Sequence, residues 1–212
     1  MPCFHQIDSS IYQFKPSVTP LSQPRLAYFG RLVGNKGIPF LLDAWSRLDI
    51  LPLPSLDIWG SGELKAELDN IIRKSPLLSS CVTLKGPYPN GLEYVNILSS
   101  YNGLVLPSQS TEGLPLVLLE AASVGLPILT TRVGGIPDFA NSNPDVVMVE
   151  VGQDALRLGL KYFLNHIQRG TKFSRTRHIS LFLSQYSRPA IESVWLRMLD
   201  NPSMFFSERT AL

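Results

Sequence analysis

Short apolar segments alternate with amphipathic stretches along most of the chain. The apolar segments lie at Arg25–Gly30, Leu56–Gly60, Val82–Gly86, Gly103–Pro107, Pro127–Thr131 and Val146–Val151. They are apolar throughout, which predicts strands buried on both faces. Helical patterns separate them, at Lys36–Leu48, Glu63–Lys74, Leu92–Tyr101, Ile136–Ala140 and Ala155–His166. Strands that alternate with helices predict a doubly wound α/β fold, in which a six-stranded parallel sheet carries helices on both faces.

The same patterns divide the chain into three parts. Residues 1–23 are rich in proline, serine and threonine, and predict an extended linker. Residues 24–170 contain the alternating strands and helices, and predict a Rossmann-like domain. Residues 171–212 predict two further helices, within Thr171–Leu199, and a frayed tail.

Composition and charge exclude several classes of protein. With 212 residues and a net charge of +2, the chain lacks the concentrated basic face that nucleic acid requires. No apolar run approaches the roughly 18–20 residues of a membrane span, and the N-terminus does not resemble a secretory signal. A cytoplasmic protein is therefore expected. Cys3 and Cys81 are interpreted as free thiols, and no Cys/His spacing suggests a metal site.

Two carboxylates, Glu112 and Glu120, stand with seven residues between them around a Gly-Leu-Pro turn that opens a helical stretch. Pro115 is predicted in the first helical turn, where its missing N–H leaves no bond unmade. The amides expected to point outward from the positive end of the helix are those of Gly113, Leu114, Leu116 and Val117. Such amides bind phosphate, whereas the flanking acids suit sugar hydroxyls. The stretch therefore predicts a diphosphate site between hydroxyl-bearing groups.

Further candidates lie at the ends of other strands, the edge where parallel sheets bind ligands. Arg31 and Lys36 follow the first strand, where two cations would neutralise a diphosphate. Gly60, after the second strand, permits a tight turn and a close approach by a ligand. The backbone of Lys85 and Gly86, at the end of the third strand, is a candidate for reading the edge of a nucleobase. The spacing does not match the Gly-x-Gly-x-x-Gly fingerprint of nicotinamide or flavin binding.

Each of these side chains also has an ordinary structural explanation. Arg31 and Lys36 would then be surface cations, and Glu112 an acid stabilised by the helix dipole. Glu120 would be an exposed helix charge. A ligand role is favoured for Glu120 because its helical neighbours are apolar, and a carboxylate is rarely buried among them without a partner. The histidines are interpreted as bystanders, and no Ser-His-Asp or Cys-His arrangement is evident.

Taken together, these segments resemble the C-terminal domain of a retaining GT-B glycosyltransferase of the group 1 type. The resemblance covers Pro24 to about Leu164. The matching motifs are Gly30-Arg31-Leu32 with Lys36-Gly37, Trp59-Gly60-Ser61-Gly62, Val82-Thr-Leu-Lys-Gly86, Leu106-Pro-Ser108, Glu112-Gly-Leu-Pro, Leu119-Glu-Ala-Ala122, Gly125-Leu-Pro127 and Val133-Gly-Gly-Ile-Pro137. One departure is Tyr101-Asn102-Gly103, where the family usually has an acid; we expect it to affect packing more than donor binding.

The resemblance implies roles for the candidate residues. Arg31 and Lys36 match the cations that hold the donor diphosphate, and Glu112 matches the acid beside the transferred sugar. Glu120 matches the acid that binds the ribose hydroxyls, and the stretch Gly113–Val117 would supply amides to sugar and phosphate. Such enzymes transfer a hexose from a nucleotide-diphosphate sugar with retention of configuration. Neither a metal nor another cofactor is expected.

The resemblance also implies a second domain that binds the acceptor. Residues 8–16 resemble the segment that joins the two domains, so the chain is expected to begin at the hinge and to need a separate acceptor-binding domain or chain. The alternatives are a non-catalytic nucleotide-sugar-binding module or a truncated glycosyltransferase, and, more remotely, another GT-B-like enzyme such as a sugar epimerase. The donor residues are intact in each case, so the sequence leaves these alternatives open. The base, the sugar and the acceptor are not determined by the motifs.

Overall fold

A six-stranded parallel sheet forms the centre of the protein. The computed structural model describes residues 23–110 and 112–200. The strands are β1 (Arg25–Phe29), β2 (Ser55–Trp59), β3 (Val82–Gly86), β4 (Gly103–Leu106), β5 (Ile128–Thr131) and β6 (Val146–Val149). All neighbours in the sheet are parallel, and the order is β3-β2-β1-β4-β5-β6. The predicted doubly wound α/β fold is confirmed. The predicted linker (except for Gln23) and the predicted tail beyond residue 200 lie outside the described residues.

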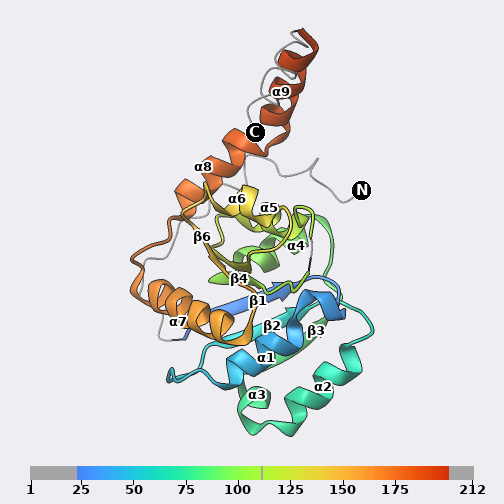
Figure 1. Cartoon of the computed structure of the whole chain (residues 1–212), viewed down its shortest axis with the longest axis vertical. Coiled ribbons are helices and arrows are strands. Elements are labelled where there is room, and N and C mark those ends of the chain that lie inside the picture. The colour runs from blue at the N-terminus through green and yellow to red at the C-terminus, as the bar shows by residue number, and fades with distance from the viewer. Residues whose placement is uncertain (1–22, 111, 201–212) are drawn as a thin grey trace.

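Helices flank this sheet (Figure 1). They are α1 (Ile38–Ser46), α2 (Lys65–Lys74), α3 (Pro76–Cys81), α4 (Gly91–Ser99), α5 (Leu116–Ser123), α6 (Ile136–Ala140), α7 (Gln153–Arg169), α8 (Arg175–Gln185) and α9 (Arg188–Asp200). Within the described part of the chain, no helix combines the length and the apolar character needed to cross a bilayer.

Two of the differences between the observed and the predicted helices have a clear physical reason. The first helix, expected from Lys36, begins at Ile38, because Gly37 takes a left-handed conformation (φ 69°) after a short 3₁₀ turn. Helix α3 was not predicted. Pro76 opens it and the Oγ atom of Ser75 accepts a hydrogen bond from the amide of Leu78 (3.3 Å). Its six residues are too few to show a helical period in the sequence.

The order of the strands reverses between β1 and β4, which lie side by side near the middle of the sheet. The chain continues from β1 to β2 on one side and from β4 to β5 on the other. The loops that follow β1 and β4 therefore start next to each other at the carboxyl edge. This is the topological switch point at which doubly wound sheets bind ligands.

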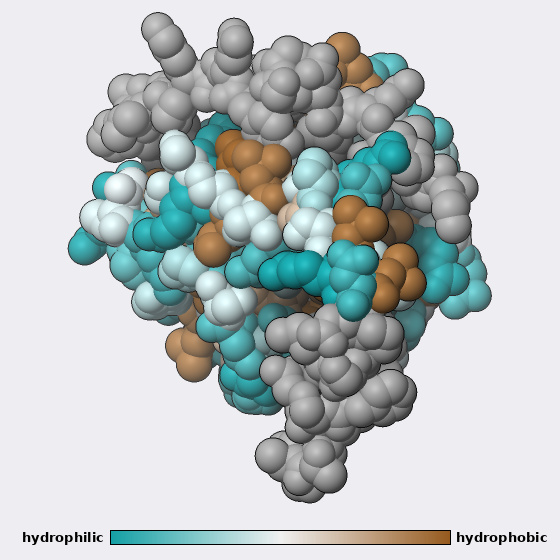
Figure 2. Space-filling model, turned by 90° about the horizontal axis from the view of Figure 1, so that it is seen from above, coloured by the Kyte–Doolittle hydropathy of each residue, from teal (hydrophilic) through white to brown (hydrophobic). Residues whose placement is uncertain are grey.

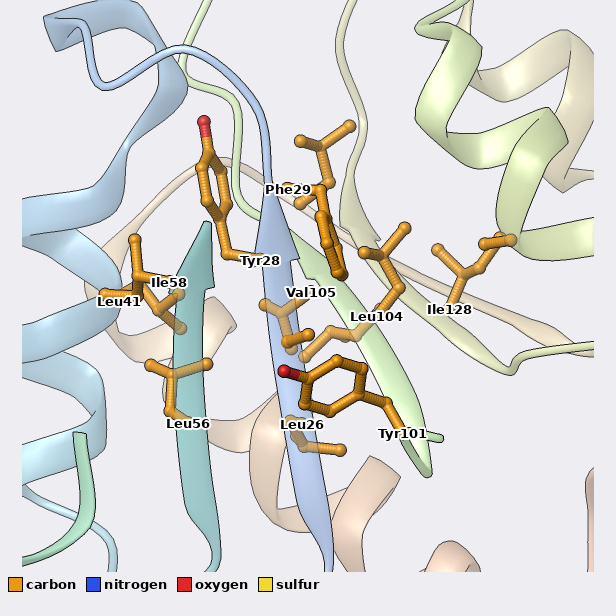
Figure 3. Packing of buried hydrophobic residues seen from close by; sticks show 14 of the residues in the cluster. Leu26, Tyr28, Phe29, Leu41, Leu56, Ile58, Tyr101, Leu104, Val105 and Ile128 are labelled. Atoms are coloured by element: carbon orange, nitrogen blue, oxygen red, sulfur yellow. The ribbon is translucent and has the colours of Figure 1, made fainter. Parts of the chain in front are cut away.

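Side chains of β1 divide the core into two layers. Tyr28 and Phe29 leave opposite sides of the strand, and Leu41 of α1 lies on the Tyr28 side (Figure 3). The Phe29 ring lies parallel to that of Trp59 (5.9 Å between centroids) and meets those of Tyr94 and two other tyrosines edge-on. One face of the central strand is thus covered by an aromatic layer, which also extends toward α4.

The last two helices differ in how they relate to this domain. Helix α8 is tied to the loop before β6 by Asp145, a completely buried carboxylate. Both of its oxygens accept hydrogen bonds from the guanidinium of Arg177 (2.9 and 2.7 Å), and one accepts from the amide of Ser174 (2.6 Å). Helix α9 projects away from the sheet (Figure 1), and its Trp195 is 61% exposed.

Candidate functional site

The loops after β1 and β4 are held together by backbone contacts. The amide of Gln109 donates to the carbonyl of Asn35 (2.8 Å). At Gly37, a Cβ atom would lie 2.0 Å from the carbonyl oxygen of Pro107, so only glycine allows this close approach. The segment that carries Lys36 is therefore packed directly against the segment that leads to Glu112.

Lys36 and Glu112 form an ion pair at this junction. The Nζ atom of Lys36 bonds to Oε1 of Glu112, and both side chains are largely buried, with 12% and 13% exposed. The Oγ atom of Ser108 donates to the same carboxylate oxygen (2.8 Å). The carbonyl of Ser108 in turn accepts from the hydroxyl of Thr131 at the end of β5 (2.5 Å). Residues at the ends of β1, β4 and β5 thus hold the Glu112 carboxylate and the Lys36 ammonium together. The sequence predicted both groups as candidates but did not predict their contact.

A pair of glycines after β5 holds the backbone of Glu112 in place. The amide of Gly135 donates to the Glu112 carbonyl oxygen (2.9 Å). Gly134 has φ +53°, and a Cβ atom on it would lie 1.8 Å from the same oxygen. The sequence placed these glycines at a strand end but did not indicate that they support Glu112.

Helix α5 begins one residue later than predicted. Pro115 was expected in the first turn, but it precedes the helix in an extended conformation (φ −63°, ψ 126°) and acts as its N-cap residue. The amide of Leu118 closes the first turn onto the Pro115 carbonyl (3.0 Å). The amides of Leu116 and Val117, at the first two helical positions, have no acceptor within the helix and lie at its positive end. The amides of Leu116 and Val117 thus lie at the free end of the helix, as the sequence predicted for these two residues.

The loop before α5 is open around Gly113. Apart from its two neighbours in the chain, no described residue has an atom within 4 Å of the position that a Cβ atom would take on Gly113. Leu114 and Leu116, on either side of Pro115, are 36% and 45% exposed despite being apolar. The backbone is thus accessible beside the Lys36–Glu112 pair.

Glu120 has a partner that the sequence did not indicate. Its Oε2 atom accepts a hydrogen bond from the hydroxyl of Tyr94 in α4 (2.7 Å). Burial raises the pKa of the Glu120 carboxyl, and the hydrogen bond from Tyr94 acts in the opposite direction. Tyr94 was overlooked because tyrosine fits equally well as an apolar core residue of an amphipathic helix, and only the packing of α4 against α5 brings the two side chains together.

The other predicted site residues lie outside this cluster. Arg31 is exposed at the carboxyl edge, and its carbonyl accepts from the hydroxyl of Tyr28 (2.8 Å). The Lys85 ammonium lies 3.7 Å from Asp57, a buried carboxylate of the neighbouring strand. The Lys85 side chain therefore points toward Asp57 of β2. The predicted contact of Lys85 with a base would involve its backbone.

The two predicted glycines serve the backbone of adjacent strand ends. Gly60 has φ +146°, and a Cβ atom on it would lie 1.8 Å from the carbonyl oxygen of Gly30. Its amide donates to the carbonyl of Gly86 (2.7 Å). The close approach that requires glycine at position 60 is thus one between two loops of the protein.

The departure from the family pattern at Tyr101-Asn102-Gly103 concerns packing. The Oδ1 atom of Asn102 accepts from the amide of Arg25 at the start of β1 (2.8 Å). At Gly103, a Cβ atom would lie 2.6 Å from the ring of Phe163. The first contact lies near the surface and the second in the core, and both are at the start of β4, away from the carboxyl edge.

Comparison with known proteins identifies the family. The family model described as glycosyl transferases group 1 matches residues 23–166, about two thirds of the chain. The chain belongs to the group 1 glycosyltransferases. The predicted resemblance to the C-terminal domain of a GT-B glycosyltransferase is confirmed.

Curated relatives of this group 1 domain act in several settings. The lipopolysaccharide core biosynthesis glycosyltransferase LpsE of Rhizobium meliloti is 27% identical over 186 residues, which is 85% of this chain and 51% of the relative. The sulfoquinovosyl transferase SQD2 of Arabidopsis thaliana is 34% identical over 117 residues, which is 55% of this chain and 21% of the relative. The chain thus spans about half of the length of LpsE and about a fifth of the length of SQD2.

Solved structures share the fold of this group 1 domain. Anabaena HepE in complex with UDP superposes with a TM-score of 0.72 at 16% identity, covering 84% of this chain and 49% of that one. A mutant of S. aureus TarM, in a complex that contains UDP, gives a TM-score of 0.70 at 19% identity, covering 87% and 37%. At such low identities the likeness concerns the fold alone.

Proposed function

We propose that this chain binds a nucleotide-diphosphate sugar and supplies the donor half of a hexosyltransferase that retains the configuration of the transferred sugar. The observation that carries the proposal is the largely buried Lys36–Glu112 pair beside the positive end of α5. It joins a cation and a carboxylate at the site where a helix end favours phosphate. Sugar transfer from a nucleotide sugar is the activity of the family to which the chain belongs.

In this proposal the diphosphate lies at the beginning of α5. The amides of Leu116 and Val117 and the ammonium of Lys36 donate to its oxygens, and Arg31 adds a second cation from the exposed loop. As the bond to the sugar breaks, negative charge builds up on the departing diphosphate, and these fixed donors stabilise it. They perform the charge neutralisation that a metal would otherwise supply, so we propose a reaction without a metal.

Glu112 and Glu120 contact the two sugar parts of the donor. Glu112 accepts hydrogen bonds from the transferred hexose, with the open backbone at Gly113 beside it. Glu120, four residues after Leu116, lies one turn further along α5 and accepts from the ribose hydroxyls. The backbone at Lys85 and Gly86 contacts the base.

We propose that the acceptor is bound by a separate domain or chain. Helix α9 supports this view, because Ile191, Trp195, Leu196 and Leu199 leave 43–73% of their surfaces exposed on one projecting helix. Apolar patches separated by polar residues are also visible on the face seen from above (Figure 2). Transfer from a nucleotide sugar on mixing with an acceptor-binding chain would support a donor half. Donor binding without transfer in any mixture would instead indicate a non-catalytic binding module.

Thermal unfolding with UDP, GDP and ADP tests the proposal directly. A ligand that binds only the folded state raises its stability by RT ln(1 + [L]/Kd), so the best-fitting nucleotide gives the largest shift in Tm. UDP is the first choice because it is bound in the solved relatives HepE and TarM. No shift with any of the three at millimolar concentrations would contradict donor binding.

Replacing Glu120 with alanine is expected to weaken binding of the best nucleoside diphosphate by about 1–3 kcal/mol, the cost of losing a hydrogen bond to a charged group. Isothermal titration calorimetry measures this change. Glu67→Ala, which removes an exposed glutamate from α2, is the matched control and leaves the affinity unchanged. Equal affinities of Glu120→Ala and the wild type would exclude the ribose role of Glu120.

A further inference from the structure

The carboxylate of Glu120 is engaged on one oxygen and open on the other. Tyr94 donates to Oε2 at 2.7 Å. Within the described residues nothing donates to Oε1, and this oxygen is not among the buried atoms that lack a partner. Oε1 is therefore accessible from solvent, and the hydrogen bond from Tyr94 restricts rotation of the carboxylate about its last side-chain bond.

The position of Tyr94 is itself determined by packing. Its side chain is nearly buried, with 8% of the residue exposed. Its ring stacks on Tyr88 (5.1 Å between centroids, 28° between planes) and meets Phe29 edge-on (5.4 Å, 76°). Phe29 of β1 and Tyr88 of the loop before α4 thus hold the Tyr94 ring in position. The Tyr94 hydroxyl therefore donates to Glu120 from a fixed position.

We propose that Tyr94 is a positioning residue for nucleotide recognition, which orients the Glu120 carboxylate so that Oε1 accepts from a ribose hydroxyl of the donor. This inference rests on the proposed function and deepens it. A carboxylate that one hydrogen bond holds in a fixed plane binds a hydroxyl better than one that rotates, because less conformational freedom is lost on binding. Tyr94 acts through Glu120 and does not itself contact the ligand.

The test removes the tyrosine hydroxyl and the ribose hydroxyls separately and together. The tightest binder among UDP, GDP and ADP is titrated calorimetrically into the wild type and Tyr94→Phe, and so is its 2′,3′-dideoxy form. We expect Tyr94→Phe to raise the Kd of the ribonucleotide about five- to tenfold, the effect of one hydrogen bond. The Kd of the dideoxy form should change less than about twofold, because that ligand has no hydroxyl for Oε1.

Tyr101→Phe is the matched control. The Tyr101 ring also meets Phe29 edge-on (5.9 Å), and its hydroxyl also donates to a carboxylate, that of Asp57 (2.8 Å). The substitution therefore removes an equivalent tyrosine–carboxylate hydrogen bond from the same aromatic layer without touching Glu120. It should leave the ratio of the two dissociation constants at the wild-type value.

The outcomes separate the inference from the proposed function. If Tyr94→Phe weakens both ligands by the same factor, or neither, its hydroxyl is only structural and the inference is overturned while nucleotide binding stands. If the wild type binds none of the three nucleotides, the proposed function fails and the inference fails with it. A selective loss of ribonucleotide affinity supports both.

Discussion

Replacing Gly134 with alanine is expected to lower the free energy of unfolding by about 3 kcal/mol and to abolish the stabilisation by nucleotide. Alanine in the left-handed region (φ +53° here) costs roughly 1–2 kcal/mol. Its Cβ atom would also lie 1.8 Å from the Glu112 carbonyl oxygen, so the loop must move. That movement breaks the hydrogen bond from Gly135 to Glu112, worth roughly 1 kcal/mol. Urea unfolding, with and without nucleotide, measures both effects.

Gly34→Ala is the matched control for this substitution. Gly34 lies in the 3₁₀ turn before Gly37. Apart from its two neighbours in the chain, no described residue has an atom within 4 Å of the position of its added Cβ atom. The control should be as stable as the wild type, or slightly more stable because the unfolded chain loses freedom. If Gly134→Ala had the same free energy of unfolding as Gly34→Ala, with and without nucleotide, the close approach of Gly134 to Glu112 would not stabilise the loop.

Acidification from pH 6.5 to pH 4 is expected to cost roughly 3 kcal/mol of stability through His178 alone. This residue of α8 is completely buried, and burial lowers its pKa from 6.5 to about 4, although the nearby Asp145 carboxylate opposes the shift. The unfolded chain therefore takes up a proton on this imidazole before the folded chain does. The stabilisation is complete above pH 6.5 and is lost as the pH falls through this window, at about 1.4 kcal/mol per pKa unit.

His178→Leu removes this titration while keeping an apolar side chain of similar size. Urea unfolding at several pH values between 7.5 and 4 should show a shallower decline for His178→Leu than for the wild type. Phe182→Leu, a buried neighbour on α8 without a titratable group, controls for repacking. It should lower stability by a similar amount at every pH. Identical slopes for the wild type and His178→Leu would refute the assignment.

The predicted sheet was confirmed because its signal is local and repeated. A strand such as Leu104–Leu106 is buried on both faces, so it is apolar at consecutive positions and is recognisable without its neighbours. Strand β3 and helix α6 have the predicted bounds. Helix α3 was missed because a six-residue helix shows too little periodicity. The start of α1 was misplaced because Gly37 delays the helix only when its φ is positive, and the sequence does not reveal that sign.

The candidate site was predicted in part, and the missing parts are contacts between distant segments. Glu112 and Glu120 stand out because acids are unusual beside an apolar helix. Tyr94, 26 positions before Glu120, does not, because a tyrosine at a core position is common. Ser108 and the glycines after β5 were present in the recognised motifs, but their contacts with Glu112 became visible only in the structure.

The sequence by itself determined the α/β fold, the alternation of its strands with the longer helices, a helix that opens beside Pro115 and the two acids that flank this opening. These features depend on residue type and on spacing along the chain, which folding preserves. The tertiary structure alone decided that Lys36 pairs with Glu112, that Tyr94 restrains Glu120 and that Lys85 turns to Asp57. Such pairings join residues up to 76 positions apart. They arise from the parallel strand order, which brings loops distant in the chain to one edge of the sheet.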